Sequence, residues 1–177
     1  MIHLELPNMK YKQTYLDTVK EFINLGSDNE STNHYLKRTL KQFDEEFEKF
    51  VQEEINNHNN IQSAGRVQCT EFWILDENDT YCGRISLRHR LNEFLTHYGG
   101  HIGYDIRPSK RGNNYATLAL GLCLKEAKKI GLDEVLITCD DDNIASIKII
   151  ERNGGVFQNT IKQDSGIMTK RYTIKVS

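Results

Sequence analysis

The residues best suited to chemistry form a basic turn rich in glycine and asparagine, from Arg107 to Thr117. The turn joins a predicted strand, which ends at Pro108, to a predicted helix. At a helix start several main-chain N–H groups lack partners within the helix, and the helix dipole adds partial positive charge there. The sequence therefore predicts that phosphate oxygens bind at this turn.

The whole chain has the size of one compact domain. Its 177 residues are 38% hydrophobic, which is enough to form a hydrophobic core. A chain of this length is too short to divide comfortably into two domains. A formal net charge of -2, from 23 basic and 25 acidic residues, gives no global attraction to nucleic acid or an anionic membrane. We expect a single domain over residues 1–177.

The cysteines and the amino terminus favour a cytoplasmic protein. The 4 cysteines form no CxxC pair and no metal-like spacing, which favours reduced thiols over disulfides or a metal site. The first residues lack the basic start and long apolar stretch of a signal peptide, and no later stretch is long enough to span a membrane. We expect no metal, nucleic-acid or membrane partner.

Residues 1–62 predict one strand and two helices. Alternation from Ile2 to Leu6 is typical of a short strand. Apolar residues then recur at three- and four-residue steps from Tyr11 to Ile23, and Gly26 ends that helix. After a polar loop over residues 28–33, the apolar face from Leu36 to Ile55 predicts one long amphipathic helix.

From Val67 onward the periodicity changes to that of strands and shorter helices. The predicted order is a hairpin, the strand before the basic turn, a helix after it, and then strand, helix and two strands. Their ranges are Val67 to Leu75 and Tyr81 to Arg88, His101 to Arg107, Ala116 to Ile130, Glu134 to Cys139, Ile144 to Arg152, Val156 to Lys162 and Met168 to Val176.

Two motifs lie within this order. Arg111-Gly112-Asn113-Asn114-Tyr115-Ala116 forms the turn, and Asn143-Ile144-Ala145-Ser146 with the later Asn153-Gly154-Gly155 follows a buried strand. Together with the element order they resemble the GNAT superfamily of acyl-coenzyme A dependent N-acetyltransferases, best over residues 67–160. The family's turn reads Arg/Gln-x-x-Gly-x-Gly/Ala, so Asn114 stands where the second glycine is usual. Asparagine tolerates left-handed backbone, so we expect the turn still to form.

The resemblance implies an α/β (α+β) fold, with a GNAT-like mixed, mostly antiparallel central sheet, a splayed parallel strand pair and flanking helices. It implies acetyl-coenzyme A as donor, with pantetheine between the splayed strands and pyrophosphate at the turn. The implied cofactor contacts are Asp105, Ile106, Arg107, Arg111, Gly112, Asn113, Asn114, Tyr115, Ala116, Thr117, Asn143 and Ser146. Plain helix capping is the alternative for Asn143 and Ser146.

The implied reaction is direct transfer to a primary amine, which must lose a proton before it attacks. His101 is the first candidate for the base, because it stands where many relatives carry glutamate and imidazole relays protons at neutral pH. Its alternative is a histidine hydrogen-bonded under the Gly99-Gly100 turn. The family's acid, a tyrosine, is matched by Ile150 and cannot be transferred. Tyr104 is the remaining candidate, although alternation places it opposite His101 unless the strand bulges.

The acceptor amine is expected across the sheet from the cofactor, where family members differ most. Glu71, Arg88, His89 and Asn92 would make this cleft polar, which suits a small amine, an amino acid or a peptide end and selects none. Homodimerisation through the late strands is a further expectation.

Three other hypotheses stay open at this point. The same fold could serve as a non-catalytic acyl-coenzyme A binding module, since Asn114 and Ile150 depart from the family pattern. A nucleotide-phosphate transferase predicts ATP binding instead, but the chain has no Gly-x-Gly-x-x-Gly after its first strand and no Gly-Lys-Ser/Thr. An acyl-cysteine route through Cys139 lacks a paired histidine, and a packed thiol is the simpler interpretation.

Overall fold

The computed structural model describes residues 1–26, 33–36, 38–59 and 66–176. Along the chain the elements are β1 (His3–Glu5), η1 (Met9–Tyr11), α1 (Lys12–Leu25), α2 (Asn33–Leu36), α3 (Leu40–Glu45), α4 (Phe47–His58), β2 (Cys69–Leu75), β3 (Tyr81–Arg88), η3 (Leu95–Gly99), β4 (Ile102–Ile106), η4 (Pro108–Lys110), α5 (Tyr115–Lys129), β5 (Glu134–Asp140), α6 (Ile144–Arg152), β6 (Val156–Lys162) and β7 (Met168–Lys175). The predicted loop over 28–33 lies outside the described residues, apart from Asn33 at the start of α2.

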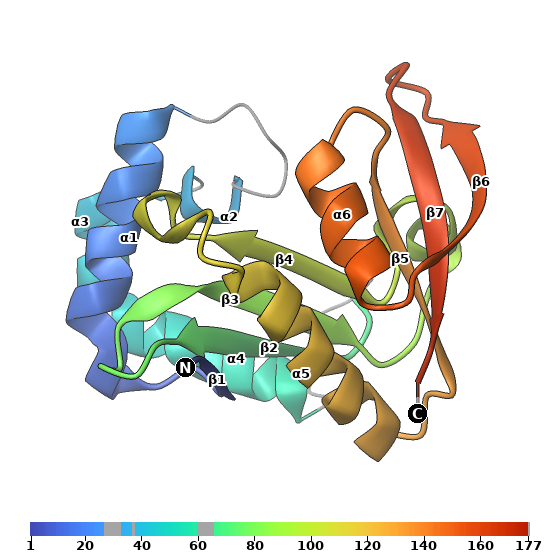
Figure 1. Ribbon diagram of the computed structural model, residues 1–177. Coiled ribbons are helices and arrows are strands. Elements are labelled where there is room, and N and C mark those ends of the chain that lie inside the picture. The colour runs from blue at the N-terminus through green and yellow to red at the C-terminus, as the bar shows by residue number, and fades with distance from the viewer. Residues whose placement is uncertain (27–32, 37, 60–65, 177) are drawn as a thin grey trace.

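The strands form two antiparallel sheets. The first has the order β1-β2-β3-β4 and the second the order β5-β7-β6. In Figure 1, α5 crosses one face of the larger sheet while α4 lies on the other, and α6 stands beside the smaller sheet. The predicted mixed fold with mostly antiparallel sheets and flanking helices is confirmed.

The two sheets meet at β4 and β5, near the start of each strand. The His101 main-chain N–H donates to the Leu136 carbonyl at 2.7 Å, and the Leu136 N–H donates to His101 Nδ1 at 2.9 Å. Further along, Asp105 on β4 and Asp140 on β5 line a common cavity instead of pairing. The strands therefore separate towards their carboxyl ends, which is the splayed pair that the resemblance implied.

The single long helix predicted from Leu36 to Ile55 is wrong. The structure has three helices there, because Thr39 and Gln42 form a reciprocal capping box that starts a new helix at Leu40, and Glu46 separates it from α4. Residues 1–62 thus contain four α-helices in the described part instead of two. Periodicity missed the breaks because Phe43, Phe47 and Phe50 stay buried in one cluster across them.

The larger sheet has a separate core on each face. Ile74, Ile85 and the α5 side chains form an aliphatic cluster on one face. Trp73, from the neighbouring position on β2, enters an aromatic cluster with α1, α3 and α4 on the other, where its ring stacks on Tyr15 at 5.1 Å. Burial on both faces fixes β2, β3 and β4 as the rigid platform of the molecule.

Candidate active site

The predicted phosphate turn forms one wall of a cavity at the amino-terminal ends of α5 and α6. This loop cavity has a volume of about 540 Å³. Its walls come from β4, the turn and both helices, namely Tyr104, Asp105, Ile106, Lys110, Arg111, Gly112, Asn114, Tyr115, Ala116, Thr117, Asn143, Ala145, Ser146, Lys148, Ile149 and Arg152. The structure therefore gathers the predicted cofactor contacts around one space, with Arg107 and Asn113 outside its lining.

The turn presents main-chain N–H groups to this cavity. Within the described chain, the N–H groups of residues 112–117 have no hydrogen-bond partner, and the Asn114 side chain makes no capping bond to α5. Gly112 has φ of +80° and Asn114 has φ of +61°, so the asparagine adopts the left-handed backbone expected of it. Unpartnered N–H groups at a helix start form a site for a phosphate anion.

Four cationic side chains line the same cavity, and in the described chain only Lys110 among them has a carboxylate within ion-pair distance. Lys110 and Arg111 come from the turn, and Lys148 and Arg152 come from α6. Sequence reasoning missed the α6 pair, although a spacing of four residues on a helix already places two side chains on one face. The donor set of N–H groups and cations fits a ligand with several phosphates.

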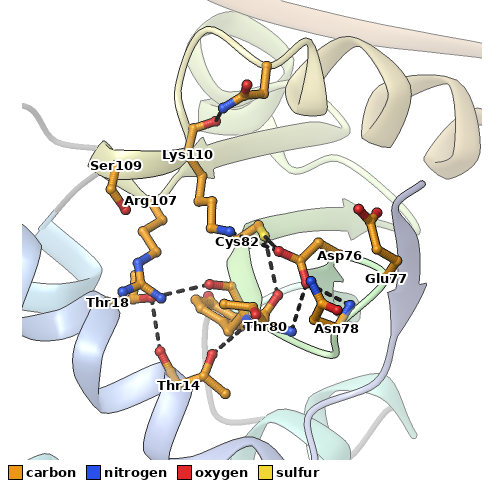
Figure 2. A network of polar contacts seen from close by, with 12 residues as sticks. Thr14, Thr18, Asp76, Glu77, Asn78, Thr80, Cys82, Arg107, Ser109 and Lys110 are labelled. Atoms are coloured by element: carbon orange, nitrogen blue, oxygen red, sulfur yellow. Dashed lines mark hydrogen bonds and ion pairs between the residues drawn. The ribbon is translucent and has the colours of Figure 1, made fainter.

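A buried network of polar contacts holds the turn in place. Lys110 Nζ lies 2.9 Å from Asp76 Oδ2 on the β2–β3 turn, and Figure 2 shows the lysine reaching across to it. The other Asp76 oxygen accepts the N–H groups of Asn78 and Thr80 at 3.0 and 3.1 Å. On the far side of the turn, Arg107 pairs with Glu21 at 2.8 Å. These contacts preorganise the turn for its ligand.

We expect Asp76→Asn to destabilise the protein by about 2 kcal/mol at neutral pH. Hydrogen bonds from Lys110, Thr80 and Asn78 outweigh burial and lower the pKa of Asp76 to about 2. Since the folded pKa lies below the unfolded one, the stabilisation is present above pH ~4 and disappears as pH falls towards 2. Unfolding temperatures measured across this range should converge for wild type and variant at low pH, with exposed Asp164→Asn as the control.

The start of α6 supplies the opposite wall of the loop cavity. Asn143 is the N-cap of α6, and its Oδ1 accepts the Ser146 N–H at 3.0 Å. The capping alternative for Asn143 is therefore present in the structure. The same two residues also line the loop cavity, so capping and ligand contact are compatible here.

A second cavity opens on the other side of the splayed strands. This sheet cavity has a volume of about 660 Å³. Arg84, Ser86 and Arg88 line it from alternate positions of β3, Thr138 to Asp140 line it from β5, and η3 adds an apolar rim through Leu95 and Tyr98. Tyr104, Asp105, Asn143 and Ser146 line both cavities. A ligand in one cavity can therefore reach a ligand in the other at these four residues.

Asp105 belongs to a buried charge network on this platform. Its oxygens accept Tyr35 Oη at 2.8 Å and Arg84 Nε at 2.7 Å, and Arg84 Nη1 donates to Glu71 Oε2 at 2.8 Å. Burial raises the pKa of Asp105 despite the guanidinium beside it. Glu71 is 4% exposed, and its Oε1 has no hydrogen-bond partner in the described chain. Carboxylates thus outnumber the arginine that neutralises them.

A third carboxyl, Glu54 on α4, gives the fold an expected alkaline sensitivity. Burial and the nearby Glu71 carboxylate raise the pKa of Glu54 to about 8. Because the folded pKa lies above the unfolded one, stability should decrease as pH rises from about 4.5 to 8, by on the order of 2–4 kcal/mol.

Glu54→Gln should remove most of that pH dependence, since the amide cannot ionise. Denaturant unfolding at pH 5, 6.5 and 8 is the measurement. The exposed Glu48→Gln on the same helix should keep the wild-type slope. An unchanged slope in Glu54→Gln would show that this carboxyl ionises freely in the folded protein.

Sequence comparison decides which family this architecture belongs to. A sequence model described as an acetyltransferase (GNAT) domain matches residues 13–156, which is most of the chain. The chain belongs to the GNAT acetyltransferase family. Among curated proteins no sequence matches it significantly.

Solved GNAT structures share the fold across almost their whole length. The self-immunity acetyltransferase MccE, solved with acetyl-CoA and AMP, is 16% identical with a TM-score of 0.71, covering 99% of this chain and 92% of its own. RimL, a ribosomal alpha-N-protein acetyltransferase solved with coenzyme A, is 18% identical with a TM-score of 0.72, covering 99% and 94%. A spermidine N-acetyltransferase chimera from Vibrio cholerae and hSSAT is 14% identical with a TM-score of 0.65, covering 98% and 94%.

Family membership makes the protein an acyltransferase that uses acetyl-coenzyme A as its donor. The loop cavity fits this donor, because its N–H groups and cations suit a pyrophosphate and its β4 wall would offer main chain to the pantetheine. In the described residues, no helix is long and apolar enough to cross a membrane. The same residues contain no group of three or more His, Cys, Asp or Glu side chains placed to hold a metal.

His101 lies at the β4–β5 junction and lines neither cavity. Its Nδ1 accepts the Leu136 N–H, which places the proton of the neutral ring on Nε2, and burial lowers its pKa. The hydrogen-bonded alternative is therefore present in the structure, next to the Gly99-Gly100 turn, and the role of catalytic base stays a prediction. In this GNAT acetyltransferase, His101 joins the two sheets.

Tyr104 lies where the two cavities meet. The β3–β4 register is regular from Ile102 to Ile106, so no bulge turns Tyr104 towards the side of His101. Burial raises its pKa to about 12, with Ser146 close enough to oppose that shift in part. Its buried hydroxyl has no hydrogen-bond partner in the described chain. A hydroxyl in this state has a hydrogen bond to give to a ligand.

The four predicted acceptor contacts are dispersed. Arg88 lines the sheet cavity, whereas Glu71 lies behind Arg84 in the ion-pair network. His89 Nε2 bonds Thr70 Oγ1 at 2.8 Å, and Asn92 accepts the Leu95 N–H at 2.9 Å and so starts the η3 segment. Neither of these two residues lines the loop cavity or the sheet cavity. Burial raises the pKa of Cys139, which does line the sheet cavity, to about 11, so the neutral thiol prevails at neutral pH.

Proposed function

We propose that the protein moves an acetyl group directly from acetyl-coenzyme A in the loop cavity to a primary amine in the sheet cavity. The observation that carries this proposal is the shared wall of the two cavities, formed by Tyr104, Asp105, Asn143 and Ser146. A donor and an acceptor entering from opposite sides would meet there, and holding two reactants in this way supplies much of the rate enhancement.

The donor would be held by the turn and the edge of β4. Main-chain N–H groups of residues 112–117 bind the pyrophosphate, and Lys148 and Arg152 approach it from α6. The open side of β4, which separates from β5, offers its main chain to the pantetheine amides as an added strand would. Asn143 has an amide nitrogen without a partner in the described chain and can donate to the same ligand.

Asp105 is our candidate for the group that takes the proton from the attacking amine. It lines both cavities, and burial raises its pKa, which makes its carboxylate a better base than an exposed aspartate. His101 fills this role less well, because its Nδ1 is engaged and it lies outside the cavities.

Tyr104 is our candidate for the group that assists the departing thiolate. Its unpartnered hydroxyl lies beside Ser146, on the wall that both cavities share. A hydroxyl whose pKa is raised to about 12 keeps its proton at neutral pH and is able to donate it to a developing thiolate. Direct transfer also agrees with the neutral state of Cys139, which makes it a weak nucleophile for an acyl-enzyme.

The test is thiol release from acetyl-coenzyme A over a panel of primary amines, with mass spectrometry of the acetylated products. We expect amine-dependent turnover and thermal stabilisation by coenzyme A but not by ATP. Stabilisation by coenzyme A without turnover on any amine would favour the non-catalytic module instead.

A further inference from the structure

Arg88 has a different electrostatic setting from Arg84 in the sheet cavity. Arg84 is neutralised by Glu71 and Asp105 at 2.8 and 2.7 Å. Arg88 has no carboxylate within ion-pair distance in the described chain, and only its Nη1 is bonded, to the carbonyls of Gly99 and Gly100 at 3.0 and 3.1 Å. Its positive charge is therefore uncompensated although the side chain is only partly exposed.

The free edge of this guanidinium has the geometry of a carboxylate site. With both Nη1 hydrogens used, Nε and Nη2 remain as two parallel donors along one side of the planar group. Paired donors of this kind bind the two oxygens of a carboxylate. The guanidinium also lies near Gly103, where an added Cβ would be in van der Waals contact with Nη2 at 3.7 Å, so the missing side chain leaves Nη2 uncovered on that side.

The other end of the cavity carries the opposite charge. Asp105, Asp140 and Asp142 line it from β4, the end of β5 and the turn that follows β5. Gly103 and Asp105 are two residues apart on β4, which is about 7 Å along a strand. An anionic group at Arg88 and an amine at the acidic end would therefore be separated by only a few bonds.

Building on the proposed function, we propose that the acceptor is a free amino acid, whose carboxylate binds the Nε and Nη2 donors of Arg88 while its amine faces Asp105. Leu95, Tyr98 and Ile167 give the same cavity an apolar wall for the side chain. The amino terminus of a protein has a peptide bond at the position of this carboxylate. A protein acceptor would therefore give the Arg88 guanidinium no negatively charged partner.

The experiment compares matched ligands that differ only at this group. Calorimetry on the coenzyme A complex with N-acetyl-L-leucine and N-acetyl-L-leucinamide measures recognition of the product without any need for turnover. We expect the acid to bind at least about 10-fold more tightly than the amide, as for one charge-assisted bidentate contact. Equal affinity, or tighter binding of the amide, would overturn the proposal.

Variants of Arg88 separate the contribution of its paired, planar donors from the contribution of its positive charge. Arg88→Gln should abolish the preference for the acid, Arg88→Lys should keep a weaker preference because it retains charge without the planar fork, and the exposed Arg90→Gln should match wild type. If Arg88→Gln fails to fold, the wild-type ratio still decides. Acid-selective binding with no turnover on any amine would sink the proposed function while supporting this inference.

Discussion

Asp105→Asn is expected to lower kcat by about 10²- to 10⁴-fold, the range typical of losing a general base. The amide keeps the shape of the side chain: its single oxygen can still accept from Arg84 Nε while its N–H donates to Tyr35 Oη, but it cannot take a proton from the amine. Because the pKa of Asp105 is raised, wild-type kcat should increase with pH as this carboxyl ionises, and the variant should lose that limb of the profile.

Two control measurements distinguish the loss of a general base from a loss of donor binding or of negative charge in general. Coenzyme A affinity, measured by calorimetry, should change by less than about 3-fold in Asp105→Asn, since the side chain points into the charge network and the donor uses the main chain. Asp141→Asn removes an equal charge at an exposed position outside both cavities and should behave as wild type. A variant that keeps wild-type kcat and the same pH profile would remove Asp105 from the mechanism.

Gly100→Ala should be among the most destabilising single changes, with a loss of more than about 3 kcal/mol. Gly100 has φ of +62°, and a Cβ there would lie 2.5 Å from the Leu136 carbonyl oxygen, which is a main-chain atom that cannot move aside. That carbonyl accepts the His101 N–H at 2.7 Å, so the clash falls on the junction that joins the two sheets. Both the free energy of unfolding and the rate of acetyl transfer should decrease.

The matched control is Gly131→Ala. Gly131 also has positive φ, at +85°, but a Cβ there would meet nothing within 4 Å. It should therefore show only the backbone cost of left-handed conformation, about 1–2 kcal/mol. Chemical denaturation of the two variants measures the difference, and equal losses would show that the β4–β5 junction tolerates a side chain.

Local signals in the sequence predicted the part of the fold that carries the donor site. Glycine and asparagine in the turn, Pro108 before it and the apolar face of α5 are neighbours along the chain, so a short window contains the information. The same holds for α6, whose cap Asn143 and helix bounds Ile144–Arg152 agree with the sequence prediction. The three separate helices before β2 were missed because one continuous apolar face hides a break that Thr39 and Gln42 impose.

The acceptor side depends on contacts between segments that are distant in the sequence, so fewer of its residues could be predicted from the sequence. Asp105 was expected to contribute main chain alone, yet its side chain meets Arg84 and Tyr35, which are 21 and 70 residues away. His101 was the first candidate for the base because of its place in a family motif, whereas the hydrogen bond that holds it at the sheet junction comes from Leu136, 35 residues further on. An acidic residue in an otherwise apolar strand was the available signal for Asp105.

A crystal structure of the protein with coenzyme A and an acceptor or product tests the proposed arrangement of the two substrates most directly. We predict the pyrophosphate on the N–H groups of residues 112–117 and the sulfur beside Tyr104 and Ser146, with the amine nitrogen on the Asp105 side of that wall. Coenzyme A bound away from the turn, or an acceptor outside the sheet cavity, would contradict it.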